Sequence, residues 1–182
     1  MKKLILLETL ILVFILGGCT SKSPLSQTTN EIPVPQQKLE DFRLIATERG
    51  MKTWELEASA AQIYEKIKKT YIQDFKTFLY EEGELASILT ARRGILDIAT
   101  SNMEATGNVV VTSTKGSRLE TEELHYLPPA GNRKGKFVTE EFVKITEPDR
   151  ITTGYGLEID SDLKNAKIKR DVKVKVEALS VP

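Results

Sequence analysis

An alternation of apolar and polar side chains with a period of two residues constrains the fold of this chain most. In "TWELEAS", residues 53–59, the apolar residues Trp54, Leu56 and Ala58 alternate with polar ones, which is typical of a strand with one buried face. The same alternation recurs in "GILDIAT" (94–100), "GLEID" (156–160) and "DVKVKVE" (171–177). No stretch beyond residue 18 repeats its apolar residues at the spacing of an amphipathic helix. The pattern predicts an all-β protein.

Turn-forming residues separate the predicted strands at short intervals. They lie at 48–50, 81–84, 100–102, 114–117, 147–150 and 160–165, and a longer polar loop, "LPPAGNRKGK", spans 127–136. Many short strands joined by turns indicate an antiparallel sandwich, barrel or jelly roll. About 140 residues remain after residue 38, which is enough for one domain with a buried core.

An internal repeat narrows this choice. Four similar segments begin at Leu56, Leu89, Leu119 and Ile151, which are 33, 30 and 32 residues apart, and each is followed by a second strand segment: "DFKTFLY", "NVVVTS", "EFVKITE" or "DVKVKVE". The alignment of the second segments predicts a β-bulge near Glu140 and Glu141. A unit that repeats its inward and outward pattern stacks strand on strand and lines one continuous apolar trough.

The N-terminus reads as an export signal. From Leu4 to Gly18 there are 15 residues interrupted by Glu8, whereas a helix that crosses a bilayer needs roughly 20 apolar residues. Lys2 and Lys3 precede the apolar run, as in a signal peptide. We therefore predict a signal peptide over residues 1–18.

The end of this signal resembles the lipobox of bacterial lipoproteins, because Leu16, Gly17 and Gly18 precede Cys19. The resemblance implies cleavage before Cys19 and lipid attachment to its sulfur; an uncleaved signal anchor with an incidental cysteine is the alternative. Cys19 is the only cysteine, so no intrachain disulfide is expected. Residues 20–38 are polar and contain three prolines, so 19–38 is predicted to be the lipidated cysteine and a flexible tether to a domain at 39–182.

Charge and residue types exclude several function classes. Loss of residues 1–18 removes two lysines and one glutamate, which leaves 24 basic and 25 acidic side chains; this balance argues against nucleic-acid binding. His125 is the only histidine and has no cysteine partner for zinc. No nucleophile and base pair is evident. We expect no enzymatic activity, no metal and no cofactor.

The segments "WELEASAAQIY", "ATGNVVVTSTKGSRLETEELHY" and "TTGYGLEID" followed by "VKVKVE" resemble the LptC family, the periplasmic bridge proteins of lipopolysaccharide transport. The resemblance implies a slightly open, V-shaped β-jelly roll whose interior holds acyl chains. It also implies receipt of lipopolysaccharide from the LptB, LptF and LptG transporter at the inner membrane and transfer to LptA. A lipid anchor replaces the membrane helix of better-known members, and Thr20 after the cysteine permits sorting to the outer membrane.

Thirteen residues are predicted to face the lipid-binding interior: Trp54, Leu56, Phe75, Leu89, Leu96, Ile98, Val109, Val111, Leu119, Leu124, Phe142, Leu157 and Ile159. A closed sandwich core in a structural lipoprotein without cargo is one alternative for the same residues. An outer-membrane lipoprotein similar to LptA is another.

The last strand, "AKIKRDVKVKVE" (166–177), is the predicted partner-binding edge. Alternation places Ile168, Val172, Val174 and Val176 inward and lysines outward. Arg170 then falls on the inward face or marks a bulge. An edge strand with outward lysines either resists aggregation or pairs with a partner strand by β-augmentation, with its basic residues near lipid phosphates.

Overall fold

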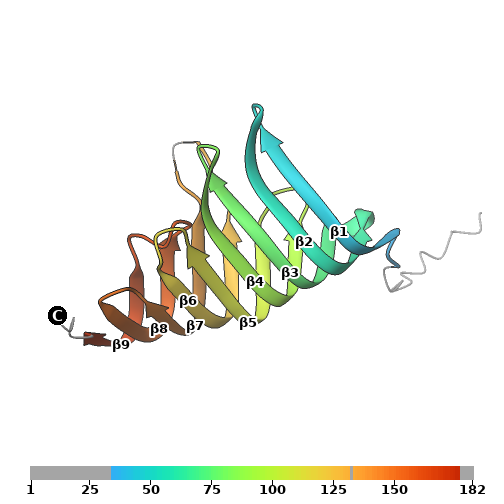
Figure 1. Ribbon diagram of the computed structural model, residues 1–182. Helices are drawn as coiled ribbons and strands as arrows, with labels where there is room; N and C mark the ends of the chain where they lie inside the picture. The colour runs from blue at the N-terminus through green and yellow to red at the C-terminus, as the bar shows by residue number, and fades with distance from the viewer. Residues whose placement is uncertain (1–33, 132, 177–182) are drawn as a thin grey trace, which may run out of the picture. The chain divides into compact units, whose positions relative to one another are not determined.

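The computed structural model describes residues 34–131 and 133–176, and these form one sheet of nine strands (Figure 1). The strands are β1 (Gln37–Glu48), β2 (Met51–Tyr64), β3 (Lys69–Glu81), β4 (Glu84–Asp97), β5 (Met103–Ser113), β6 (Arg118–Leu127), β7 (Lys136–Thr146), β8 (Arg150–Asp160) and β9 (Lys167–Val176). A short 3-10 turn, η2 (Glu65–Ile67), joins β2 to β3.

The order of strands in the sheet is the order of the chain, and every neighbouring pair is antiparallel. The sheet does not close, because β1 and β9 each have one neighbouring strand in it. This confirms the predicted all-β, antiparallel fold, an open β-jelly roll, and does not fit a closed sandwich. The predicted turns and the 127–136 loop all lie between strands, and β1 begins at Gln37, two residues before the predicted domain start.

Each long strand is interrupted near its middle. Asp41, Asp74, Asn108 and Asp171 have positive φ angles between 42° and 52°, a conformation that short polar side chains tolerate. The pairing shifts register at the same level, for example between Thr106 and Val109. These interruptions bend the sheet along a line across the strands, so that two walls of the same sheet face one another (Figure 1).

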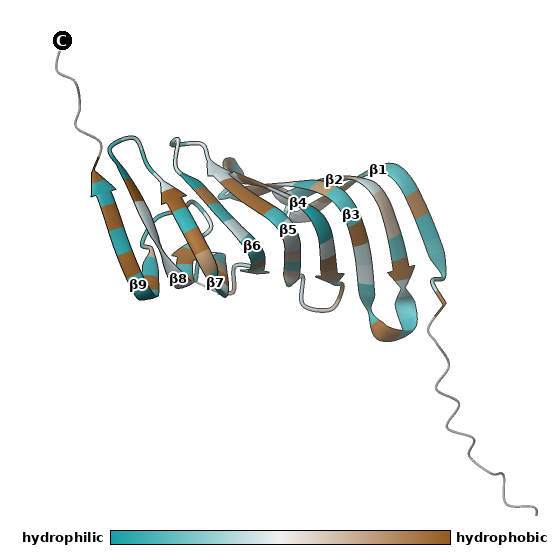
Figure 2. Ribbon diagram, turned by 90° about the horizontal axis from the view of Figure 1, so that it is seen from below, coloured by the Kyte–Doolittle hydropathy of each residue, from teal (hydrophilic) through white to brown (hydrophobic). Residues whose placement is uncertain are grey.

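We call the half-strands next to the turns at 49–50, 82–83, 114–117 and 147–149 the first wall. The half-strands next to 65–68, 98–102, 128–135 and 161–166 form the second wall. The apolar core lies between them. Figure 2 shows hydrophobic residues alternating with hydrophilic ones along the strands. The repeat of about 32 residues corresponds to two strands, since its first segment falls on β2, β4, β6 and β8.

The β-bulge predicted near Glu140 and Glu141 is confirmed, because the register of β7 and β8 shifts between Thr139 and Phe142. At the "GYG" segment, residues 154–156, the backbones of β8 and β9 approach closely. A Cβ on Gly154 would lie 2.8 Å from the carbonyl oxygen of Arg170, and Gly156 has a φ of +71°.

Two residues predicted to face the interior do not. Ile98 is 50% exposed because β4 ends at Asp97 and Ile98 lies in the following turn. Phe142 is 46% exposed on the outer face. Its neighbour Val143 is fully buried, and consecutive residues of a strand point to opposite faces.

The inward placement of Arg170 is also wrong, and the bulge interpretation is correct. Arg170 pairs with Tyr155 on the outer face, where its guanidinium lies 6.0 Å from the centre of the ring. The register shift between Thr153 and Tyr155 and the positive φ of Asp171 reverse its direction. Ile168 stands opposite Leu157, as an inward residue should.

The predicted signal peptide, Cys19 and most of the tether lie outside the described residues. In the part of the chain that the structure describes, no helix has the length and apolar character needed to cross a membrane.

Candidate functional site

The space between the two walls contains most of the predicted interior residues. Ten of the thirteen are buried, with exposed fractions from 0% to 7%: Leu56, Phe75, Leu89, Leu96, Val109, Val111, Leu119, Leu124, Leu157 and Ile159. Trp54 is partly buried and packs against them. They come from strands β2 to β6 and β8, so they form one continuous apolar interior rather than separate clusters.

The structure adds interior residues that the sequence interpretation missed. Ile72, Leu79, Phe137, Val143 and Ile145 are buried on β3 and β7. The alternation in "KFVTEEFVKIT" was a usable signal for part of this set, but the bulge interrupts it. Leu163 is 6% exposed and joins the core from the loop between β8 and β9, where no strand pattern marks it.

Buried hydroxyl groups interrupt the apolar interior. Thr77 from the first wall lies with its Oγ1 atom 3.9 Å from the sulfur of Met103 on the second wall. Ser87 is fully buried, and its Oγ has no hydrogen-bond partner within the described chain. In this state the walls are in contact, and their own side chains fill the space between them.

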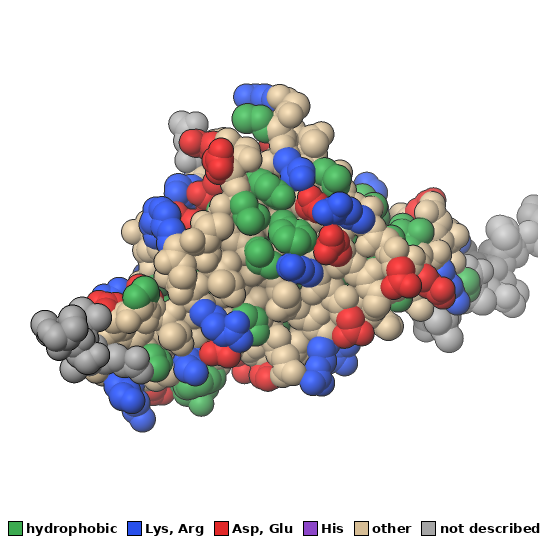
Figure 3. All heavy atoms as spheres, viewed as in Figure 1, with side chains coloured by type: hydrophobic (Ala, Val, Ile, Leu, Met, Phe, Trp, Pro, Cys, Tyr) green, Lys and Arg blue, Asp and Glu red, His purple; other side chains and the backbone are tan. Residues whose placement is uncertain are grey.

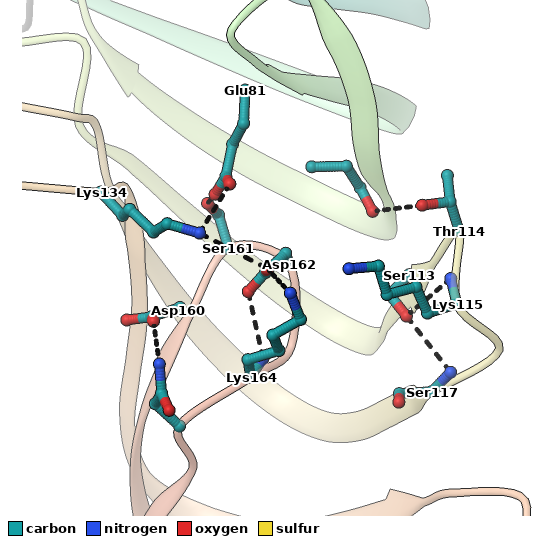
Figure 4. A network of polar contacts seen from close by, with 12 residues as sticks. Glu81, Ser113, Thr114, Lys115, Ser117, Lys134, Asp160, Ser161, Asp162 and Lys164 are labelled. Atoms are coloured by element: carbon teal, nitrogen blue, oxygen red, sulfur yellow. Dashed lines mark hydrogen bonds and ion pairs between the residues drawn. The ribbon is translucent and has the colours of Figure 1, made fainter.

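Polar residues bridge the mouth of the trough, where the free ends of the walls meet. Glu81 at the end of β3 belongs to the first wall, and it accepts a hydrogen bond from the hydroxyl of Ser161, 80 residues away in the second wall. Lys134 of the second wall also contacts Glu81, with 3.1 Å between Nζ and Oε2. Figure 4 shows this network reaching from β3 to the loops of the second wall.

The loop between β8 and β9 takes part in closing the mouth. Ser161, Asp162 and Leu163 are all buried, and Leu163 has a φ of 60°, which is costly for a bulky side chain. Burial opposes ionisation of Asp162, yet hydrogen bonds from Lys164 keep the pKa of its carboxyl below the ordinary range. The Asp162 Oδ2 atom lies 3.1 Å from Lys164 Nζ and 3.5 Å from Lys134 Nζ.

The trough is open at its β9 end. The predicted partner-edge residues Val172, Val174 and Val176 are 52%, 57% and 71% exposed. Val174 is paired with Thr152, the neighbour of buried Ile145, so it continues the inner face. Among residues 34–131 and 133–176, no strand follows β9 in the sheet to cover these side chains.

The described residues hold no group of His, Cys, Asp and Glu side chains that could bind a metal ion. His125 Nε2 lies 3.0 Å from Glu123 Oε1 at the surface of β6. The geometry therefore points to an interior that binds apolar groups and to a charged mouth above it.

A comparison with protein families shows which family has this sequence pattern. The chain matches the family described as lipopolysaccharide-assembly, LptC-related, over residues 4–177. It belongs to the LptC family. No protein of curated function shows significant similarity to the chain. LptC proteins are periplasmic bridge proteins of lipopolysaccharide transport rather than a family of enzymes, and the match covers every strand of the sheet.

Proposed function

We propose that the chain binds the acyl chains of lipopolysaccharide between its two walls. The observation that carries the proposal is the continuous row of buried apolar residues from Leu56 on β2 to Ile159 on β8 in a sheet that does not close. Transfer of a methylene from water into such an interior is worth about 0.8 kcal/mol. An acyl chain of about a dozen carbons therefore gains several kcal/mol there, enough to replace contacts between the walls.

The free edges of the sheet could pair with strands of neighbouring proteins. We propose that the chain receives lipopolysaccharide from the transporter made of LptB, LptF and LptG and passes it to LptA. The free edge of β9, with its exposed Val172, Val174 and Val176 and the outward Arg170, offers backbone groups for pairing with a partner strand. The exposed valines would continue the apolar path into the partner.

We further propose that Cys19 carries a lipid that holds the domain at the periplasmic face of the inner membrane. Stable anchoring needs more than one acyl chain, which lipoprotein modification supplies. Separation of inner from outer membranes tests the location, because Thr20 permits either membrane. Recovery of LptF, LptG or LptA from crosslinked membranes tests the transfer partners.

Adjacent residues on β8 provide the test of the interior. Leu157 is fully buried between the walls, whereas the side chain of Glu158 is 44% exposed on the outer face. A photo-crosslinking amino acid at Leu157 should capture lipopolysaccharide in cells, and one at Glu158 should not. Capture from Glu158 alone would show that the lipid binds outside the trough and would contradict the proposal.

A further inference from the structure

A cavity of about 640 Å³ lies at the mouth of the trough near its β9 end. Its apolar floor contains Ile145, Leu163 and Ile168, which belong to the core or pack against it. Its rim is polar and includes Lys115 and Lys164. The volume falls in the range of ligand sites, and an apolar floor with a few convergent polar groups is their usual composition. The cavity therefore suits an amphiphilic ligand.

The two rim lysines come from opposite walls. Lys115 lies in the turn between β5 and β6 on the first wall, and Lys164 lies in the loop between β8 and β9 on the second. Figure 4 shows these two segments facing each other across the mouth. The interaction with the Lys164 side chain and its charge lowers the pKa of Lys115. Two ammonium groups that line one cavity repel each other unless an anion screens them.

The carboxylates of the mouth do not supply enough negative charge. Asp162 is shared between Lys164 and Lys134, and Glu81 is engaged by Lys134 and Ser161. Among the described residues, no carboxylate forms an ion pair with Lys115. Glu147 and Arg150 also line the cavity and neutralise each other, with 2.6 Å between Arg150 Nε and Glu147 Oε2. The three lysines then face two carboxylates, which leaves one positive charge in excess above the apolar floor.

Phosphate is the anion that fits this arrangement in a protein that carries lipopolysaccharide. We propose that Lys115 and Lys164 bind a phosphate group of the lipid headgroup while the acyl chains enter between the walls beside Ile145 and Leu163. This rests on the proposed function and adds a headgroup site that selects phosphorylated lipid. Charge-assisted hydrogen bonds from two ammonium groups to one phosphate are the strong kind. Figure 3 shows side chains of both signs mixed over the face in view.

The test compares lipid A bearing both phosphates with lipid A from which both have been removed, each titrated into the full-length chain in detergent. We expect the wild-type chain to bind the phosphorylated form at least about tenfold more tightly, and the Lys115→Gln/Lys164→Gln variant to lose most of this preference. The matched control is Lys38→Gln/Lys76→Gln, which removes two exposed lysines from β1 and β3 that do not line the cavity. It should keep the wild-type preference.

The outcomes separate this inference from the function on which it rests. Equal binding of both lipids by the wild-type chain, or an unchanged preference in the Lys115→Gln/Lys164→Gln variant, overturns the headgroup site alone. Failure of the wild-type chain to bind either lipid overturns the lipid-carrying function, and the headgroup site with it. Inorganic phosphate alone should not raise the unfolding temperature. If it does so in the wild-type chain and not in the variant, the site binds free phosphate and the lipid assignment is wrong.

Discussion

At the scale of single residues, Gly94 shows how tightly the interior is packed at the bend. It lies on β4 opposite the ring of Phe75, and a Cβ built on Gly94 would lie 2.7 Å from Cε1 and 2.9 Å from Cζ of that ring. Phe75 is 3% exposed, so the ring cannot move aside without disturbing its neighbours. Glycine is needed here because of this close approach.

We therefore predict that Gly94→Ala lowers the free energy of unfolding by about 1–3 kcal/mol, the usual cost of forcing a methyl group into a packed core. Urea unfolding followed by tryptophan fluorescence measures it through Trp54, the only tryptophan of the chain. In a double-mutant cycle, Phe75→Leu should cost less in the Gly94→Ala background than in the wild-type chain, because the smaller side chain relieves the clash. Equal costs in both backgrounds would place the strain elsewhere.

At the scale of elements, the turn between β4 and β5 is held by one carboxylate. Asp97 Oδ2 accepts a hydrogen bond of 2.9 Å from Lys69, and Oδ1 accepts bonds of 3.0 Å from the backbone N–H groups of Ala99 and Thr100. The Lys69 bond, and after it the backbone bond from Thr100, lowers the pKa of Asp97 to about 2. These bonds need the ionised form, so they stabilise the fold above the ordinary pKa of 3.8 and are lost as the pH falls toward 2.

Replacement of Asp97 by Asn should therefore destabilise the protein at pH 6, and the difference from the wild-type chain should shrink between pH 4 and pH 2. Urea midpoints at pH 6, 4 and 2.5 measure this difference. Asp149→Asn removes a carboxylate from the turn between β7 and β8 and serves as the control. A constant difference between the Asp97→Asn variant and the wild-type chain over this pH range would contradict the assignment.

The strands and turns also show how much of the fold the sequence predicts. Alternation and turn residues predicted the strands and loops correctly, because each strand half has one buried face and polar turns at its ends. The V shape was expected only through the resemblance to the LptC family, and the position of the bend within each strand was not predicted. Its sequence signal is a polar residue followed by an apolar one at Asp41, Asp74 and Asn108, which are 33 and 34 residues apart. In several strands the alternation of inward and outward residues shifts by one position at the bend. On β2, for example, Ala58 and Ala61 are both buried although they are three residues apart. A pattern continued through the bend therefore assigns side chains to the wrong face.

Site prediction was limited in the same way. Leu56, Leu89 and Leu119 are buried as the alternation predicts, because all three lie on the first wall, on one side of the bend. Phe142 was misplaced because the alignment with Phe75 crossed the bulge of β7. The bridge from Glu81 to Ser161 joins residues 80 positions apart, and no local pattern in the sequence brings them together. These two residues come together only when the whole sheet folds.

At the scale of the whole molecule, that bridge bears on how lipid reaches the interior. The core residues of the two walls are buried, so acyl chains can enter through the mouth only if the walls separate. The contacts of Glu81 with Ser161 and Lys134 cross the mouth and must break for this to happen. The Lys134 side chain is 52% exposed, so water can replace its contact with Glu81 at small cost. Ser161 is buried, so water reaches its bond to Glu81 only as the mouth begins to open.

We predict that a covalent link across the mouth blocks lipid entry. In a Cys19→Ser background, Glu81→Cys and Lys134→Cys place one thiol on each wall, and a bis-maleimide linker with a cleavable disulfide should reduce lipopolysaccharide binding at least about tenfold, a change of about 1.4 kcal/mol or more in binding free energy. Reduction of the linker should restore binding. The control, Glu120→Cys with Lys144→Cys, replaces an ion pair of 3.4 Å within the first wall, so its link should leave binding unchanged. Full binding by the linked Glu81 and Lys134 pair would show that lipid enters without separation of the walls, from the open end at β9.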